Sequence, residues 1–172
     1  ATLVRDSRGQ PDTLIGVNHD ISERNEIEQK LRDSETRFRS FYDVVPDMFV
    51  IAEMETLKFV DVNEGFCRLT GYSKDDAIGK SAAELNLFEV PQNRLSLLAE
   101  LEENDRYENV AVSIKNRDGT IWPGIASASI IEIDNRRLVL ASIKDISEIR
   151  RSQMEAIAAN QAKSTFLSSM SH

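Results

Sequence analysis

A run of three adjoining strand-like segments constrains the fold more than any other part of the chain. The segments cover residues 109–115, 120–133 and 136–144, and each is rich in β-branched or alternating apolar residues. The breaks between them, Arg117-Asp118-Gly119 and Asp134-Asn135, have the composition of tight turns. Segments joined so closely can pair only as antiparallel neighbours, because a parallel connection needs a dozen or more residues. The chain therefore contains an antiparallel sheet.

Two further strands and three helices precede this run. Residues 48–52 and 57–62 form the pattern of a hairpin. Helices are predicted over 64–69, 74–78 and 91–103; Asn63 and Ser73 stand at N-cap positions, Gly71 and Gly79 follow the first two helices, and Leu95, Leu98 and Leu101 form an apolar stripe on the third. The order predicts an α+β fold: a five-stranded antiparallel sheet with helices on one face, flanked by helices at both ends.

A short internal repeat suggests that one joint occurs twice. Asp20-Ile21-Ser22-Glu23 recurs at residues 145–148, each time after a strand-like segment and before a charged helical run. Asp20 and Asp145 are predicted helix N-caps, and Glu23 and Glu148 occupy the capping-box position. Such a joint is a short path from a sheet into a helix. The repeat also predicts that residues 1–19 are the last hairpin of a preceding domain.

The predicted connecting helix, residues 20–42, carries apolar residues at heptad spacing. Ile27, Leu31, Ser34, Phe38 and Phe41 follow one another at intervals of four and three. Two interpretations remain open: an amphipathic helix that packs on its own domain, or a parallel coiled coil in a homodimer.

Charge and composition exclude several classes of function. The chain has 172 residues, and its 21 Lys and Arg against 29 Asp and Glu leave a net charge of −8, which argues against nucleic acid as a partner. No run of about 18 apolar residues is present, so no membrane contact is expected within this segment. A single Cys allows no internal disulfide and favours a reducing, cytoplasmic location.

Four motifs together resemble those of the PAS domain family of sensory modules, over residues 34–147. They are residues 59–73 (FVDVNEGFCRLTGYS), 78–80 (IGK), 116–120 (NRDGT) and 144–148 (KDISE). The resemblance implies a PAS fold and four parts: residues 1–19, the C-terminal hairpin of a preceding PAS domain; 20–42, a connecting helix; 43–147, the PAS sensor domain; and 148–172, an exit helix.

The last ten residues, KSTFLSSMSH, resemble the start of the phosphoacceptor box of sensor histidine kinases. This implies that His172 is phosphorylated, and a neutral imidazole is a competent nucleophile near pH 7. It further implies ATP and Mg²⁺ bound by a kinase domain that this sequence lacks, a homodimer, and a response-regulator receiver domain as partner. The chain is thus interpreted as the cytoplasmic sensory and relay region of a two-component kinase, inactive alone, whose parent could be membrane-anchored elsewhere.

A ligand cavity is predicted beside Trp122. Trp122, Gly124, Ala126 and Ala128 share one face of a strand by its period of two, which places small residues next to one large ring. The alternative is that Phe66, Leu87 and Phe88 fill this space. The predicted walls are Phe49 or Ile51 with Phe59, Phe66, Leu69 and Leu140, together with Trp122 and Ala126.

The resemblance permits a small-molecule ligand without naming one. A heme is not expected, because no His lies between Asp20 and Ser171 to supply an axial ligand. Cys67 lies in a context, GFCRLTG, that differs from that of light-sensing flavin domains. Two other interpretations stay open: a ligand-free interaction and dimerisation module, and a flavin-binding redox sensor, for which the sequence offers no motif.

Overall fold

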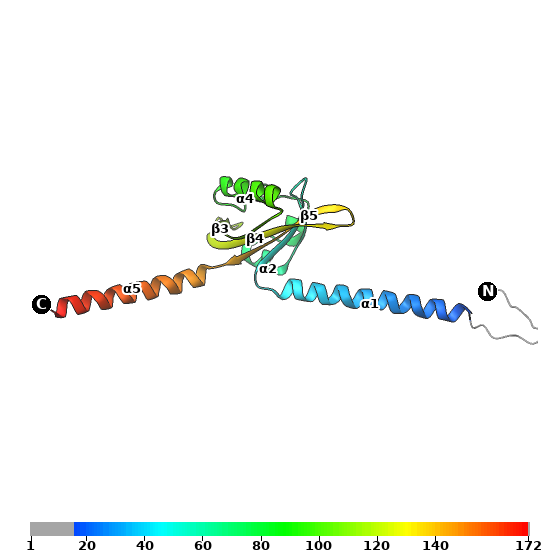
Figure 1. Ribbon diagram of the computed structural model, residues 1–172, viewed down its shortest axis with the longest axis horizontal. Helices are drawn as coiled ribbons and strands as arrows, with labels where there is room; N and C mark the ends of the chain where they lie inside the picture. The colour runs from blue at the N-terminus through cyan, green and yellow to red at the C-terminus, as the bar shows by residue number, and fades with distance from the viewer. Residues whose placement is uncertain (1–15, 172) are drawn as a thin grey trace, which may run out of the picture. The chain divides into compact units, whose positions relative to one another are not determined.

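The structure is a computed structural model that describes residues 16–171, with side chains from residue 21 onward (Figure 1). The chain divides into two units, residues 1–41 and 42–172. None of the described helices is long and apolar enough to cross a membrane. The elements are α1 (Gly16–Val44), β1 (Met48–Glu53), β2 (Phe59–Val62), α2 (Glu64–Thr70), α3 (Lys74–Ala77), α4 (Pro91–Asn104), β3 (Arg106–Lys115), β4 (Ile121–Ile133), β5 (Arg136–Asp145) and α5 (Ser147–Met170).

The second unit is built on one five-stranded antiparallel sheet in the order β2-β1-β5-β4-β3. Helices α2, α3 and α4 contribute Phe66, Ala77 and Leu97 to the same buried cluster as the inward-facing residues of the strands. The predicted α+β architecture, with five strands and helices on one face, is confirmed. The last strand in sequence, β5, lies in the middle of the sheet, between β1 and β4.

Local signals in the sequence set the ends of the short helices. The side chain of Asn63 caps α2, and Gly71 ends it in the left-handed region at φ 76°. Ser73 and Asp76 form a complete capping box at α3. The β4–β5 turn places Asp134 and Asn135 at φ 50° and 61°, as a two-residue hairpin loop requires. These predicted caps and turns are all confirmed.

The apolar stripe of α4 differs from the predicted one. Leu97 and Leu101 are buried, Leu98 is half-buried, and Leu95 is 61% exposed. At 100° per residue, Leu95 lies about 200° around the helix from Leu97, so the two cannot face the sheet together. The prediction for Leu95 was wrong, and Leu97 takes its place.

Helix α1 begins earlier than the internal repeat predicted. It starts at Gly16, so Asp20 lies in the second turn and is not its N-cap, and Glu23 is not at a capping-box position. Residues 16–19 are helical rather than part of a hairpin. The rest of the predicted hairpin, residues 1–15, lies outside the described residues. The heptad side chains of α1 are exposed, Phe41 by 72%, and the coiled coil stays a prediction.

The joint between β5 and α5 is close to the predicted one but shifted by one residue. Helix α5 begins at Ser147 and its N-cap, Ile146, makes no side-chain cap bond, so Glu148 is not at the third helical position and the predicted capping box does not form. Asp145 still serves the helix start, because its Oδ1 accepts hydrogen bonds from the Ser147 N–H (2.8 Å) and hydroxyl (2.6 Å). The Ile146 N–H donates to the Pro123 carbonyl on β4 (3.0 Å).

Candidate functional site

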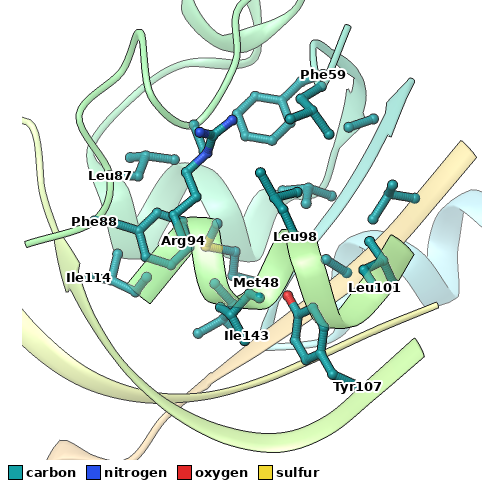
Figure 2. Close-up of a pocket in the computed structure, with 17 residues that line it drawn as sticks. Met48, Phe59, Leu87, Phe88, Arg94, Leu98, Leu101, Tyr107, Ile114 and Ile143 are labelled. Atoms are coloured by element: carbon teal, nitrogen blue, oxygen red, sulfur yellow. The ribbon is translucent and has the colours of Figure 1, made fainter. Parts of the chain in front are cut away.

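A cavity of about 90 Å³ lies between α4 and the inner face of the sheet (Figure 2). Its walls are almost entirely apolar, and they come from elements far apart in the sequence. The main contributors are Met48, Val50 and Ala52 of β1, Arg94, Leu97, Leu98 and Leu101 of α4, Tyr107 and Ile114 of β3, and Val139, Ala141 and Ile143 of β5.

Small residues beneath α4 account for the space. Ala52 and Ala141 face the helix from adjacent strands, β1 and β5, where their neighbours carry larger side chains. Ala82, in the segment before α4, adds a third small side chain to the wall. Interiors are otherwise close-packed, so three methyl groups facing a helix leave room that Leu97 and Leu101 do not fill.

Two polar side chains interrupt the apolar wall. Arg94 reaches the cavity from α4, with its guanidinium drawn between Phe59 and Phe88, and the Tyr107 hydroxyl points toward the other lining residues (Figure 2). Among the residues that the structure describes, neither group has a hydrogen-bond or ion-pair partner. Burial, reinforced by the nearby Glu100 carboxylate, raises the pKa of Tyr107 to about 12. The phenol therefore stays neutral and able to donate.

The predicted cavity beside Trp122 is not where this cavity lies. Trp122 and Ala126 do face inward and are buried, as predicted. However, the indole Nε1 donates to the Leu69 carbonyl (3.1 Å) and to Asn116 Oδ1 (2.7 Å), which directs the ring toward the end of α2. Phe66 is fully buried in the packed core. Of the predicted walls, Phe59 lines the cavity, and Phe66, Leu69, Trp122 and Ala126 do not.

The remaining predicted walls belong to the other face of the sheet. On β1 the inward residues are Met48, Val50 and Ala52, which leaves Phe49 and Ile51 on the outer face, and on β5 Leu140 is outward. Leu140 and Phe49 line a separate surface hollow on that side. The alternative for the space beside Trp122 agrees better with the structure, because Phe66 and Leu87 are buried in one cluster with Trp122 and Phe88 packs against it. Leu87 and Phe88 also line the separate cavity under α4.

Sequence reasoning missed Arg94, although a signal for it exists. Leu97, Leu98 and Leu101 follow it at the spacings of three, four and seven residues that place side chains on one helix face. A cation in register with a buried stripe is uncommon. Once the stripe is assigned correctly, Arg94 stands out as its only charged member.

Some of the residues predicted to connect the sheet to the phosphoacceptor lie within the described part of the chain, and others do not. Asp145 and Glu148 lie at the described joint between β5 and α5, where only the Asp145 side chain bonds the helix start. The phosphoacceptor candidate His172 lies outside the described residues. Helix α5 continues without a break to Met170.

Comparison with known protein families matches residues 46–148, more than half of the chain, to the PAS domain. The chain belongs to the PAS domain family. The match covers β1 to the first turn of α5, so the cavity under α4 is the space between sheet and helices of a PAS fold.

Relatives of this PAS domain are named as sensors. The chain is 29% identical over 128 residues to the methyl sulfide methyltransferase-associated sensor of Methanosarcina acetivorans, covering 72% of this chain and 12% of that protein. It is 26% identical over 159 residues to the sensor protein FixL of Bradyrhizobium diazoefficiens, covering 89% and 31%. The chain thus spans less than a third of either relative and is a PAS sensory domain with its flanking helices.

A solved PAS structure confirms the fold. The PAS domain of an HTR-like protein from Haloarcula marismortui superposes with a TM-score of 0.61 at 20% identity, over 71% of this chain and 99% of that one.

Proposed function

We propose that this chain is the sensory and relay region of a two-component sensor histidine kinase that is phosphorylated on His172. The observation that carries the proposal is the path of β5. Val139, Ala141 and Ile143 line the cavity, and the same strand passes through Ile146 into α5. Helix α5 leads to residues 163–172, the segment that resembles a phosphoacceptor box. One strand and one helix thus connect the cavity wall with the segment that precedes His172.

The connection between β5 and α5 is hydrogen-bonded to residues of both β5 and β4, which suits it to a relay. Asp145 holds the first N–H of α5, and the Ile146 N–H is bonded to Pro123 on β4. A change in the sheet at β4 or β5 therefore moves the start of the helix. A ligand drives such a change only by the difference in its affinity for two arrangements of the domain. ATP and Mg²⁺ are supplied by the kinase domain of the full-length protein, and a receiver domain accepts the phosphoryl group.

The exposed apolar residues of the two long helices support a homodimer. On α5 they include Ile149, Met154, Ile157, Phe166, Leu167 and Met170, and on α1 Ile27, Leu31, Phe38 and Phe41. Exposed apolar side chains in such number mark contact sites. On α1 the spacings of four, seven and three residues place them in one stripe of the kind that pairs in coiled coils. The proposal places the region in the cytoplasm, where the free thiol of Cys67 stays reduced.

The test is phosphorylation of the full-length kinase with γ-labelled ATP. We expect an acid-labile, base-stable label that is lost in His172→Gln and retained in His19→Gln, the matched control for the second histidine of this segment. Label that survives His172→Gln, or no label under any condition, would refute the kinase assignment.

A second candidate is a ligand-free interaction module, favoured by the small size of the cavity. Its volume of about 90 Å³ is below the ~150 Å³ of a cavity that holds benzene. Neither a flavin nor a heme fits this space, and the lining contains no His or Cys to bind an iron. The absence of a heme stays a prediction. Absorption spectra of the purified protein test for a flavin and for a heme. A ligand that co-purifies in the cavity would favour the sensor over the interaction module.

A further inference from the structure

We infer that the cavity under α4 binds a small carboxylate, with a short apolar chain inside the cavity and the carboxylate on Arg94. The inference deepens the sensory role proposed above and rests on it for its meaning, but ligand binding can be measured without any kinase activity. It depends on three observations: an unpaired cation, an apolar wall, and a volume that limits the size of the guest.

The cation is the first observation. Each described ion pair joins a Lys or Arg to a carboxylate, and none of them includes Arg94. Arg94 is half-buried on the sheet-facing side of α4, and a cation withdrawn from water is costly without a counter-charge. A planar carboxylate matches the guanidinium through two parallel hydrogen bonds. The site therefore lacks the partner that a bound carboxylate would supply.

The wall is the second observation. Apart from Arg94 and Tyr107, the lining consists of apolar side chains. Such a surface gives no hydrogen bonds to a highly polar guest such as inorganic phosphate, but it favours an alkyl chain. The Tyr107 hydroxyl, neutral and without a partner among the described residues, offers one additional donor to a polar substituent on the guest.

Volume is the third observation, and it sets the chain length. A six-carbon ring occupies a cavity of ~150 Å³, so about 90 Å³ accommodates about three or four carbons. With the carboxylate outside on Arg94, butyrate places three carbons in the cavity. A long fatty acid exceeds the space, and formate leaves it empty.

The test is a titration of the chain with sodium butyrate, followed by amide chemical shifts in NMR, with n-butanol and formate as probes that lack the charge and the alkyl chain. We expect saturable butyrate binding with shifts at β1, α4 and β5, weaker binding of n-butanol, and no saturable binding of formate. Arg94→Met keeps the apolar stem without the charge and should weaken butyrate at least about tenfold without weakening n-butanol.

Two further variants make the result specific. Arg150→Met removes the same charge from the exposed face of α5 and should leave butyrate affinity unchanged. Ala141→Leu fills the cavity from β5 with Arg94 in place and should abolish binding of both four-carbon probes. Unfolding midpoints confirm that each variant is folded.

Several outcomes would overturn the inference. These are no butyrate binding, equal binding of butyrate and n-butanol that Arg94→Met leaves unchanged, or formate binding as strong as butyrate binding. None of these outcomes bears on the phosphorylation of His172, and loss of that label would not alter the titration. The two proposals can thus fail separately.

Discussion

The strongest stability prediction concerns Asn63, whose side chain joins four segments of the second unit. The residue is 1% exposed. Its Oδ1 accepts from the N–H groups of Phe49 and Phe66 (both 2.9 Å), and its Nδ2 donates to the carbonyls of Tyr42 (2.9 Å) and Asp47 (3.0 Å). One amide thus links the end of α1, the α1–β1 connection, β1 and the start of α2.

The expected cost follows from these four bonds. In Asn63→Ala the cap of α2 is lost, which costs about 1 kcal/mol, and three further bonds to partly or fully buried backbone groups are lost at about 0.5–1.5 kcal/mol each. The sum is a loss of about 3–5 kcal/mol in the free energy of unfolding, or roughly 12–20 °C in Tm for a unit of this size.

Urea and thermal unfolding followed by circular dichroism measure this loss. Asn63→Asp is the sharper variant, because its carboxylate retains both accepted bonds but faces two carbonyl oxygens without a proton to donate. It should also be strongly destabilised at pH 7. Asn93→Ala, on the exposed side of α4, should change stability by no more than about 0.5 kcal/mol. A stability of Asn63→Ala within 1 kcal/mol of the parent, or an Asn63→Asp variant as stable as the parent, would refute the reasoning.

Three further predictions follow from local geometry. Gly65→Ala should destabilise the domain by several kcal/mol in urea unfolding, because an added Cβ would lie 2.1 Å from the Asp47 carbonyl oxygen; an unchanged midpoint would contradict this. Cys67 should react with iodoacetamide at pH 8 more slowly than a free cysteine, because its pKa is raised, mainly by burial and further by nearby acidic side chains. A reaction faster than that of free cysteine would contradict the raised pKa. The hydrogen bonds from Ser73 lower the pKa of Asp76, so their stabilisation is complete above the carboxyl's unfolded pKa of about 3.9 and is lost as the pH falls through the lower folded value. An NMR titration should show that Ser73→Ala raises the pKa of Asp76, and an unchanged value would count against the bond.

The parts of the fold that were predictable share a strong local signal. Asn63, Gly71, Ser73 and the Asp134-Asn135 turn each need a particular backbone conformation, which few residue types supply. The inward face of β4 was also predictable, because its inward positions carry a tryptophan followed by Gly and Ala residues. The outward positions between them carry Pro, Ile and Ser residues.

The parts that were missed lie where the sequence is apolar at every position. Residues 48–52 and 138–141 carry no alternation, so the inward face of β1 and β5 depends on pairing with neighbouring strands. The cavity predicted beside Trp122 was misplaced because the indole is directed toward the end of α2 by a bond to the distant Leu69 carbonyl, which the sequence does not indicate. Arg94 went unrecognised because the α4 stripe was assigned to Leu95 rather than Leu97.

The central place of β5 limits the kind of motion that can reach α5. The strand is hydrogen-bonded to β1 on one side and to β4 on the other. A slip by one residue would turn Val139, Ala141 and Ile143 out of the cavity wall and break both ladders at once. Sliding of β5 along its axis is therefore an unfavourable way to move α5. In the proposed relay, a change at the cavity would therefore reach α5 as a tilt or twist of neighbouring strands that keep their partners. It would alter the angle at which the helix leaves the sheet rather than its position along the strand.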